Sequence, residues 1–176
     1  DLGATRVRPA LFDGDFEMVE ASVPPNVAGF LRELVRTPEF AALKREDAFL
    51  REWRAAWEKV PGVPTFAAAH GLITSGDFVL LTSRAHLPGE GLLMLPGGEL
   101  HPQLSLAASL RRHVLEQAGV VLPAVGARPV EVFDHPDRSP LGREVAHVFA
   151  GDVKGRSGNG WRRIDDALSR PAEIYA

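Results

Sequence analysis

The first third of the chain carries apolar residues at helical spacing. After Pro24-Pro25, an i, i+3, i+4 pattern predicts one apolar helix face, formed by Val27, Phe30, Leu31, Leu34 and Val35. A second helix is predicted after Thr37, a residue type that caps helix N-termini, with an apolar stripe of Phe40, Leu43, Phe49, Leu50, Trp53 and Trp57. Residues 61–64, Pro-Gly-Val-Pro, end it. Residues 1–22 are mixed and only weakly patterned.

Beyond residue 64 the pattern changes to short apolar runs typical of β-strands. These runs are 66–73, 78–83, 92–95, 129–133 and 145–149. Residues 104–118 have helical periodicity, Gly119 stands where a C-terminal cap belongs, and 161–168 suggest a closing strand or a short helix. Strands before, around and after one helix predict an α+β fold with a mixed sheet. We therefore divide the chain into a mostly helical N-terminal segment, 1–60, and a second domain, 61–176.

Composition narrows the classes of function. The 176 residues suit one domain with an appendage, and the absence of cysteine excludes disulfides and thiolate metal sites. The net charge of -3 provides no general attraction for nucleic acid, so we expect no nucleic-acid partner. No apolar run approaches the roughly 20 residues of a membrane span, and no signal peptide opens the chain. We expect a cytoplasmic protein without a membrane partner.

The segment from Pro96 to Val120 holds the residues from which a function can be argued. Six of its residues have a defined mutual spacing: Gly98, Arg112, Val114, Glu116, Gly119 and Val120. This spacing resembles the Nudix box, G-x5-E-x7-R-E-U-x-E-E-x-G-U, in which U is a bulky aliphatic residue. Leu104, His113 and Gln117 stand at three of the four acidic positions, so the box is degenerate.

The resemblance implies a Nudix fold, a mixed sheet sandwiched by helices, and hydrolysis of nucleoside diphosphate derivatives. Divalent cations neutralise the phosphates and activate water in such a reaction, and carboxylates at i, i+3 and i+4 share one helix face. We predict Glu116 and His113 as catalytic residues, and Glu116, Gln117 and the loop residue Glu99 as metal ligands. The cofactor is Mg or Mn if the protein is active, and none otherwise. Alternatively, His113 and Glu116 are ordinary solvated residues. Leu104 is predicted to pack in the core.

The similarity extends beyond the box to residues 63–66, 84–92 and 133–143. Together these segments resemble the Nudix domain of bifunctional nicotinamide-mononucleotide adenylyltransferase/ADP-ribose pyrophosphatases, and they are somewhat similar to Nudix-type regulators of NAD metabolism. The resemblance implies an ADP-ribose-like ligand. The predicted substrate-binding residues are Gly97, Gly98, Arg84, Arg138 and Arg143, since a glycine loop admits phosphate and guanidinium groups bind it bidentately. The alternative for the arginines is surface salt bridging.

The N-terminal segment adds a second resemblance. Residues 2–8 resemble the I-S-x-T-x-x-R motif of nucleotidyltransferases, with Gly3 in place of the serine, and 26–57 resemble the helical tail of such a domain. The H-x-G-H motif of those enzymes is absent from the sequence. We expect either that an upstream domain was removed or that the gene is a shortened descendant.

Three functions remain open at this stage. The first is a Nudix-fold protein that binds an NAD-related nucleoside diphosphate such as ADP-ribose and hydrolyses it weakly or not at all. The second is an active diphosphate hydrolase with a rebuilt metal site, in which Glu116 acts with Glu99, His113 or Asp134. The third is a non-catalytic interaction module, such as a homodimer, motivated by apolar helix residues such as Phe30, Phe49, Trp53 and Trp57.

Overall fold

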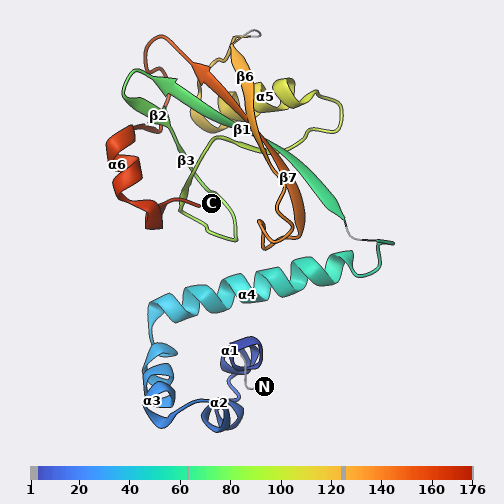
Figure 1. Ribbon diagram of the computed structural model, residues 1–176, viewed down its shortest axis with the longest axis vertical. Helices are drawn as coiled ribbons and strands as arrows, with labels where there is room; N and C mark the ends of the chain where they lie inside the picture. The colour runs from blue at the N-terminus through green and yellow to red at the C-terminus, as the bar shows by residue number, and fades with distance from the viewer. Residues whose placement is uncertain (1–3, 63, 124–125, 176) are drawn as a thin grey trace. The chain divides into compact units, whose positions relative to one another are not determined.

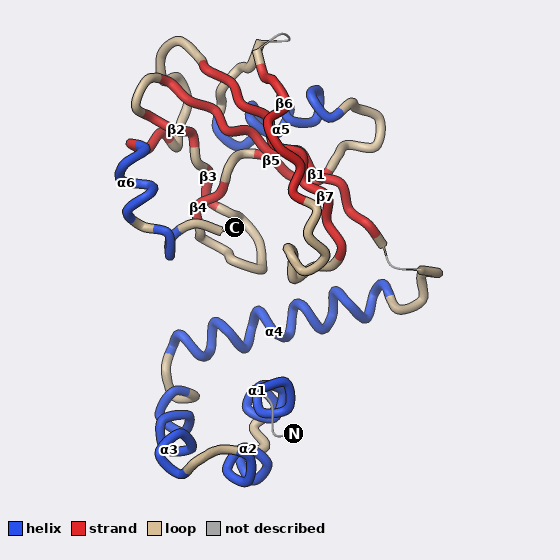
Figure 2. Tube along the Cα trace, in the orientation of Figure 1, coloured by secondary structure: helices blue, strands red, loops and turns tan. Residues whose placement is uncertain are grey.

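The computed structural model describes residues 4–62, 64–123 and 126–175, which fall into two compact units, Asp1–Ala55 and Ala56–Ala176. Each unit has its own hydrophobic core. The first consists of helices, whereas the second contains all the strands found among the described residues (Figures 1 and 2). Leu2 and Gly3 of the N-terminal motif, and Val63, lie outside the described residues.

Four helices form the first unit: α1 (Ala4–Asp13), α2 (Phe16–Ser22), α3 (Pro25–Leu34) and α4 (Pro38–Trp57), the last of which runs into the second unit. The helical N-terminal segment is therefore confirmed. Helices α3 and α4 begin where the sequence predicts, and the Thr37 hydroxyl accepts the Phe40 N–H at 3.2 Å. The sequence pattern does not predict α1 and α2, because α1 contains Pro9 and α2 has only 7 residues.

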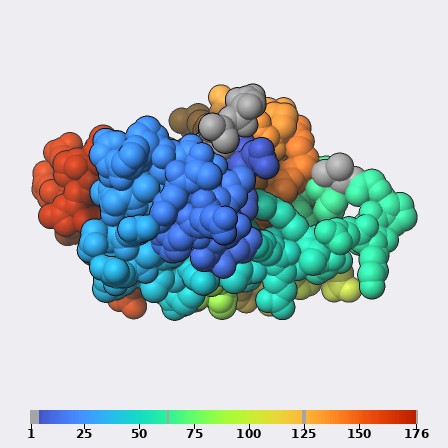
Figure 3. All heavy atoms as spheres, turned by 90° about the horizontal axis from the view of Figure 1, so that it is seen from below, coloured from blue at the N-terminus to red at the C-terminus, as the bar shows by residue number. Residues whose placement is uncertain are grey.

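The core of this unit is small. Its buried residues are Ala10, Leu11, Val19 and Phe40, and the ring of Phe12 stacks on that of Phe40 with centroids 5.5 Å apart. The apolar stripe of α3 is only partly used, since Phe30 remains 65% exposed. Figure 3 shows one face of these helices, with their atoms as spheres in blue to cyan. No helix among the described residues combines the length and apolarity required to cross a membrane.

The second unit is built on a mixed sheet with strand order β6-β7-β1-β2-β8 and with β5 also paired to β1. Strand β1 (Thr65–Ser75) runs parallel to β7 (Arg143–Asp152), and all other pairs in this sheet are antiparallel. The remaining members are β2 (Phe78–Leu80), β5 (Gly97–Glu99), β6 (Ala127–Phe133) and β8 (Trp161–Arg163). A separate pair joins β3 (Thr82–Ser83) to β4 (Leu93–Met94).

Helix α5 (Leu106–Ala118) packs against the central strand β1 and creates the core of this unit (Figure 1). Ser105 caps its start by accepting the Ala108 N–H, and Gly119 ends it in the left-handed conformation, as predicted. Its buried face meets alternate residues of β1, and the largest fully buried members of this core are Ile73, Leu80, Leu110, Val114 and Val120. A short helix, α6 (Ile164–Ser169), follows β8, and a 3-10 turn covers Pro171–Glu173. The α+β fold class is confirmed.

Two expectations about this unit are wrong in detail. Residues 78–83 form two strands in different sheets, because the chain turns off at Leu81, whose N–H is accepted by the carbonyl of Gly160. Leu104, predicted as core, is 38% exposed, because α5 begins two residues later and leaves it in the preceding loop. Residues 161–168 contain both of the alternatives considered, a strand followed by a helix.

Side chains of β1 alternate between the two faces of the sheet, so substitutions at adjacent residues should differ in their effect on stability. Replacing Ile73, which is fully buried, by Ala should lower the free energy of unfolding by about 2–5 kcal/mol, since it leaves a cavity under α5. The control Leu72→Ala, on the other face and 38% exposed, should cost less than about 1 kcal/mol. Urea unfolding followed by circular dichroism measures both, and equal losses would contradict the assigned faces.

Candidate functional site

Gln117 joins helix α5 to strand β5 through both atoms of its side-chain amide. Its Oε1 accepts the N–H of Gly97 at 2.9 Å, and its Nε2 donates to the carbonyl oxygen of the same residue at 2.8 Å. Gly97 has no room for a side chain, because a Cβ atom would lie 2.3 Å from the carbonyl oxygen of Ala69 on β1. The backbone of Gly97 is thus held from two sides, by the sheet and by the Gln117 amide.

Glu116 faces solvent and forms an ion pair one turn back along α5. Its Oε1 lies 2.7 Å from Nε of Arg112, and the two side chains are 54% and 49% exposed. The hydrogen bond from Arg112 lowers the pKa of Glu116, so the carboxylate stays ionised at neutral pH. Among the ion pairs of the described residues, Arg112 takes part in one, with Glu116.

His113 contacts the backbone of the glycine loop. Its Nε2 lies 2.8 Å from the carbonyl oxygen of Glu99, and its ring lies over Gly98, where a Cβ atom would meet Cε1 at 3.2 Å. Glu99 itself is exposed. The structure thus brings His113 and Gln117 into contact with the backbone of strand β5, with Glu116 beside them on the helix.

These residues do not match the oxygen-rich set that Mg²⁺ requires. Within residues 4–62, 64–123 and 126–175, no group of three or more His, Cys, Asp or Glu side chains converges closely enough to hold a metal ion. The Gln117 oxygen already accepts a hydrogen bond, and Glu116 already pairs with a guanidinium group. Because Mg²⁺ favours six oxygen ligands in nearly ideal geometry, these residues are a poor fit for it.

A cavity of about 770 Å³ opens on the other face of the sheet, between β1, β6, β7 and the C-terminal residues. Its lining residues include Arg84, Arg138 and Tyr175, which come from three separate segments of the chain, and the acidic residues Asp134 and Glu144. Apolar residues such as Leu95, Phe133 and Val148 form much of the remaining wall. This combination of apolar walls with a few charged groups is typical of small-molecule sites.

The three predicted arginines occupy different environments. The guanidinium of Arg84 donates to the Pro88 carbonyl oxygen and lies 4.3 Å from the centre of the Tyr175 ring. Arg138 also lines the cavity, but it forms an ion pair with Glu144. Arg143 is not among the lining residues, and its guanidinium donates to the carbonyl oxygen of Asp134. Among the ion pairs of the described residues, none neutralises Arg84.

His70 is a cavity residue that the sequence analysis did not select. It lies in β1, paired with Gly97 on one side and Val148 on the other. Burial lowers the pKa of its imidazole, while the charge of Glu144 and a hydrogen bond with the Leu95 backbone oppose that shift. The alternation of β1 could have placed His70 on the face opposite Ala69 and Ile73, but only tertiary structure shows a cavity there. No comparable sequence pattern could have placed Glu144 or Tyr175 at this cavity.

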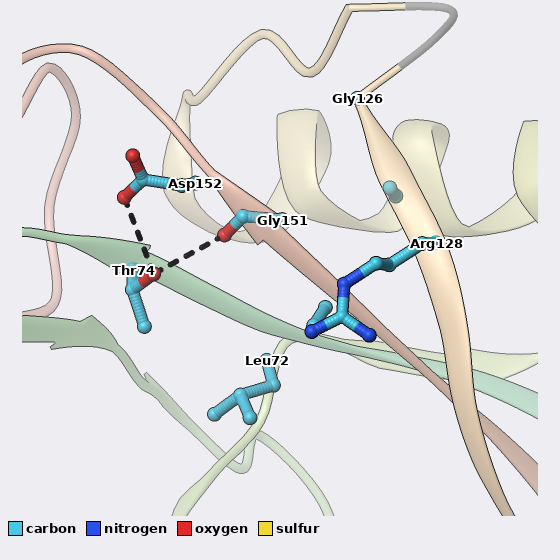
Figure 4. A pocket seen from close by; sticks show the side chains of 8 residues that line it. Leu72, Thr74, Gly126, Arg128, Gly151 and Asp152 are labelled. Carbon is cyan, nitrogen blue, oxygen red and sulfur yellow. Dashed lines mark hydrogen bonds between the residues drawn. The ribbon is translucent and has the colours of Figure 1, made fainter.

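A second hollow of about 560 Å³ lies farther along the same strands. Figure 4 shows Arg128 extending over it from β6, with Leu72 below and Thr74 beside Asp152. The Thr74 hydroxyl donates to the Asp152 carboxylate at 3.3 Å. This hollow contains none of the predicted site residues, which makes Arg128 a useful reference for the arginines of the larger cavity.

Comparison with known proteins identifies the second unit. The family model for the NUDIX domain matches residues 64–174. A bifunctional NMN adenylyltransferase/ADP ribose pyrophosphatase from Francisella tularensis is 27% identical, with a TM-score of 0.81 over 94% of this chain. A structure of such a protein complexed with AMP and a Mn ion is 28% identical, with the same TM-score and coverage. This chain spans only 51% of either protein.

A more distant structure shares the fold alone. The NUDIX domain of Shewanella oneidensis NrtR, complexed with ADP ribose, is 20% identical, with a TM-score of 0.56 over 68% of this chain and 86% of that domain.

The lowered pKa of His70 predicts a pH-dependent stability. Below the ordinary pKa of 6.5, His70 is protonated in the unfolded chain but stays neutral in the folded chain until a lower pH. The free energy of unfolding therefore falls as the pH decreases from that value. His70→Gln should flatten this slope below about pH 6.5, whereas His86→Gln, at an exposed position, should retain it. Urea unfolding at a series of pH values tests this. An unchanged slope in His70→Gln would show that another group is responsible.

Proposed function

Because this chain belongs to the Nudix family, we propose that it binds an NAD-related nucleoside diphosphate such as ADP-ribose and hydrolyses it weakly or not at all. The observation that carries this proposal is the pair of hydrogen bonds that Gln117 makes. At a position where the family box has an acidic residue, both amide atoms of Gln117 are bonded to the backbone of Gly97.

The shape and charge of the large cavity support binding. Its volume of about 770 Å³ lies within the range of small-molecule sites. Arg84 supplies a positive charge that no ion pair among the described residues neutralises, and Tyr175 and Phe133 supply aromatic surface. A phosphate is the complementary group for such a guanidinium. The structural neighbours complexed with AMP and with ADP ribose are consistent with this class of ligand.

The chemistry of the box supports weak or absent hydrolysis. Attack on a diphosphate requires charge neutralisation and an activated water, which metal ions supply in this family. Glu116 is the single carboxylate left at the four acidic positions of the box, and it is paired with Arg112. Each 1.36 kcal/mol of lost transition-state stabilisation lowers the rate about tenfold. A loss of several kcal/mol therefore reduces turnover by orders of magnitude.

An active hydrolase with a rebuilt metal site is the competing candidate. It would use Glu116, the one carboxylate at the four acidic positions of the box, which lies on α5 beside His113. The rebuilt site requires Glu99, His113 or Asp134 to act with it. Binding and hydrolysis must therefore be measured separately.

Binding should depend on Arg84. Arg84→Gln is expected to raise the dissociation constant for ADP-ribose about tenfold or more, since a hydrogen bond to a charged group contributes about 1.5–3 kcal/mol. Arg128→Gln, in the smaller hollow, is the matched control and should leave the constant unchanged. Isothermal titration calorimetry measures both variants. Equal weakening by the two substitutions would point to general charge attraction rather than to this cavity.

Hydrolysis should be lower by about a thousandfold or more than that of a Nudix enzyme with a complete box. The measurement is AMP release from ADP-ribose in the presence of Mg²⁺ or Mn²⁺, with the reference enzyme assayed in parallel. Comparable turnover that disappears in Glu116→Gln would establish the active alternative.

A further inference from the structure

The segment that leads into the box glycines also forms part of the cavity wall. Leu95 lines the cavity, the Pro96 carbonyl oxygen accepts the Gly71 N–H at 2.8 Å, and Gly97 pairs with His70. A displacement of Gly97 would therefore move both Leu95 and the surroundings of His70. The position of this short segment couples the box helix to the cavity on the opposite face of the sheet.

We infer that the Gln117 amide holds Gly97 against α5 without a metal ion, and that the ligand cavity is therefore formed without a divalent cation. The second part rests on the proposed function, because it concerns how the nucleoside diphosphate binds. The first part concerns this chain's own residues and can be tested without any ligand. Gln117 is a positioning residue in this arrangement, since it acts on the cavity through Gly97.

An amide is suited to this role and a carboxylate is not. Gly97 presents one donor and one acceptor to the helix, and an amide side chain offers one of each in return. A carboxylate could accept the N–H, but its second oxygen would face the carbonyl oxygen of Gly97 with no proton between them. A cation between the two oxygens, or a displacement of the loop, would then be needed to relieve the repulsion.

The neighbouring polar groups are satisfied in the same cation-free manner. Arg112 supplies the positive charge beside Glu116, and His113 contacts the carbonyl oxygen of Glu99. A cation entering here must displace the guanidinium or disrupt the contact between Gln117 and Gly97. Both exchanges are unfavourable, because each replaces an existing interaction while only one carboxylate of the box is present to repay the desolvation of the ion.

The decisive measurement is thermal unfolding of the whole chain in EDTA and in MnCl₂ up to about 5 mM, with no nucleotide added. We expect the same melting temperature in both, because a cation that does not bind the folded state cannot stabilise it. A rise that grows with Mn²⁺ concentration and is lost in Glu116→Gln would overturn the inference. This arm requires no substitution in the amide contact itself.

A pair of glutamine variants tests the amide contact. In EDTA, Gln117→Glu should lower the melting temperature by roughly 3–6 °C, whereas Gln103→Glu, which makes the same charge change at an exposed loop residue, should alter it by less than about 1 °C. At a temperature where both variants are folded, Gln117→Glu should also weaken ADP-ribose binding about fivefold or more in EDTA. Equal melting and equal binding for the two variants would refute the positioning role.

Ligand binding separates this inference from the proposed function. The wild-type chain should bind ADP-ribose with the same dissociation constant in EDTA and in Mn²⁺. Binding that occurs only with Mn²⁺ would overturn the inference and leave the proposed ligand class intact. No binding under either condition would refute the proposed function, while the ligand-free melting measurement would still decide the role of Gln117.

Discussion

The two hydrogen bonds between Gln117 and Gly97 link the helix of the box to the sheet and to the cavity behind it. Gly97 lies so close to Ala69 that no side chain fits, and its own N–H and carbonyl are both bonded to one amide. A buried backbone group must find a partner, because leaving it unsatisfied costs about 1–3 kcal/mol. The choice of glutamine at this position therefore has consequences for the backbone as well as for the chemistry of the box.

Two arginines of the second unit near the box and the cavity form ion pairs with carboxylates. Arg112 pairs with Glu116, and Arg138 pairs with Glu144. Arg84 differs, because its guanidinium contacts a carbonyl oxygen and the Tyr175 ring. No ion pair of the described residues involves Arg84, and a guanidinium group of this kind beside an aromatic ring is suited to an incoming phosphate. The proposed ligand cavity and the residues of α5 thus lie on opposite faces of one sheet, joined at Gly97.

The predictable parts of the fold were those with local causes. Ser105 and Gly119 delimit α5 because a side-chain cap and a left-handed residue satisfy its ends within a few residues. The mixed sheet followed from strands placed around one helix. Helices α1 and α2 could not be predicted. Helix α1 contains Pro9, a residue type that disfavours a helix interior, and the 7 residues of α2 cover barely two turns. The interruption between β2 and β3 at Leu81 involves a hydrogen bond to Gly160, which is distant in sequence.

The sequence by itself determined the family and the spacing of the candidate residues, because spacing along a helix decides which side chains share a face. Only the tertiary structure decided how those residues are used. Gln117 is a possible oxygen ligand in the sequence, but in the fold its amide meets the backbone of a residue 20 positions away. His70 and Tyr175 become neighbours of the same cavity because strand pairing and the chain's return to β4 bring them there. Contacts between distant residues follow from packing, which no local pattern encodes.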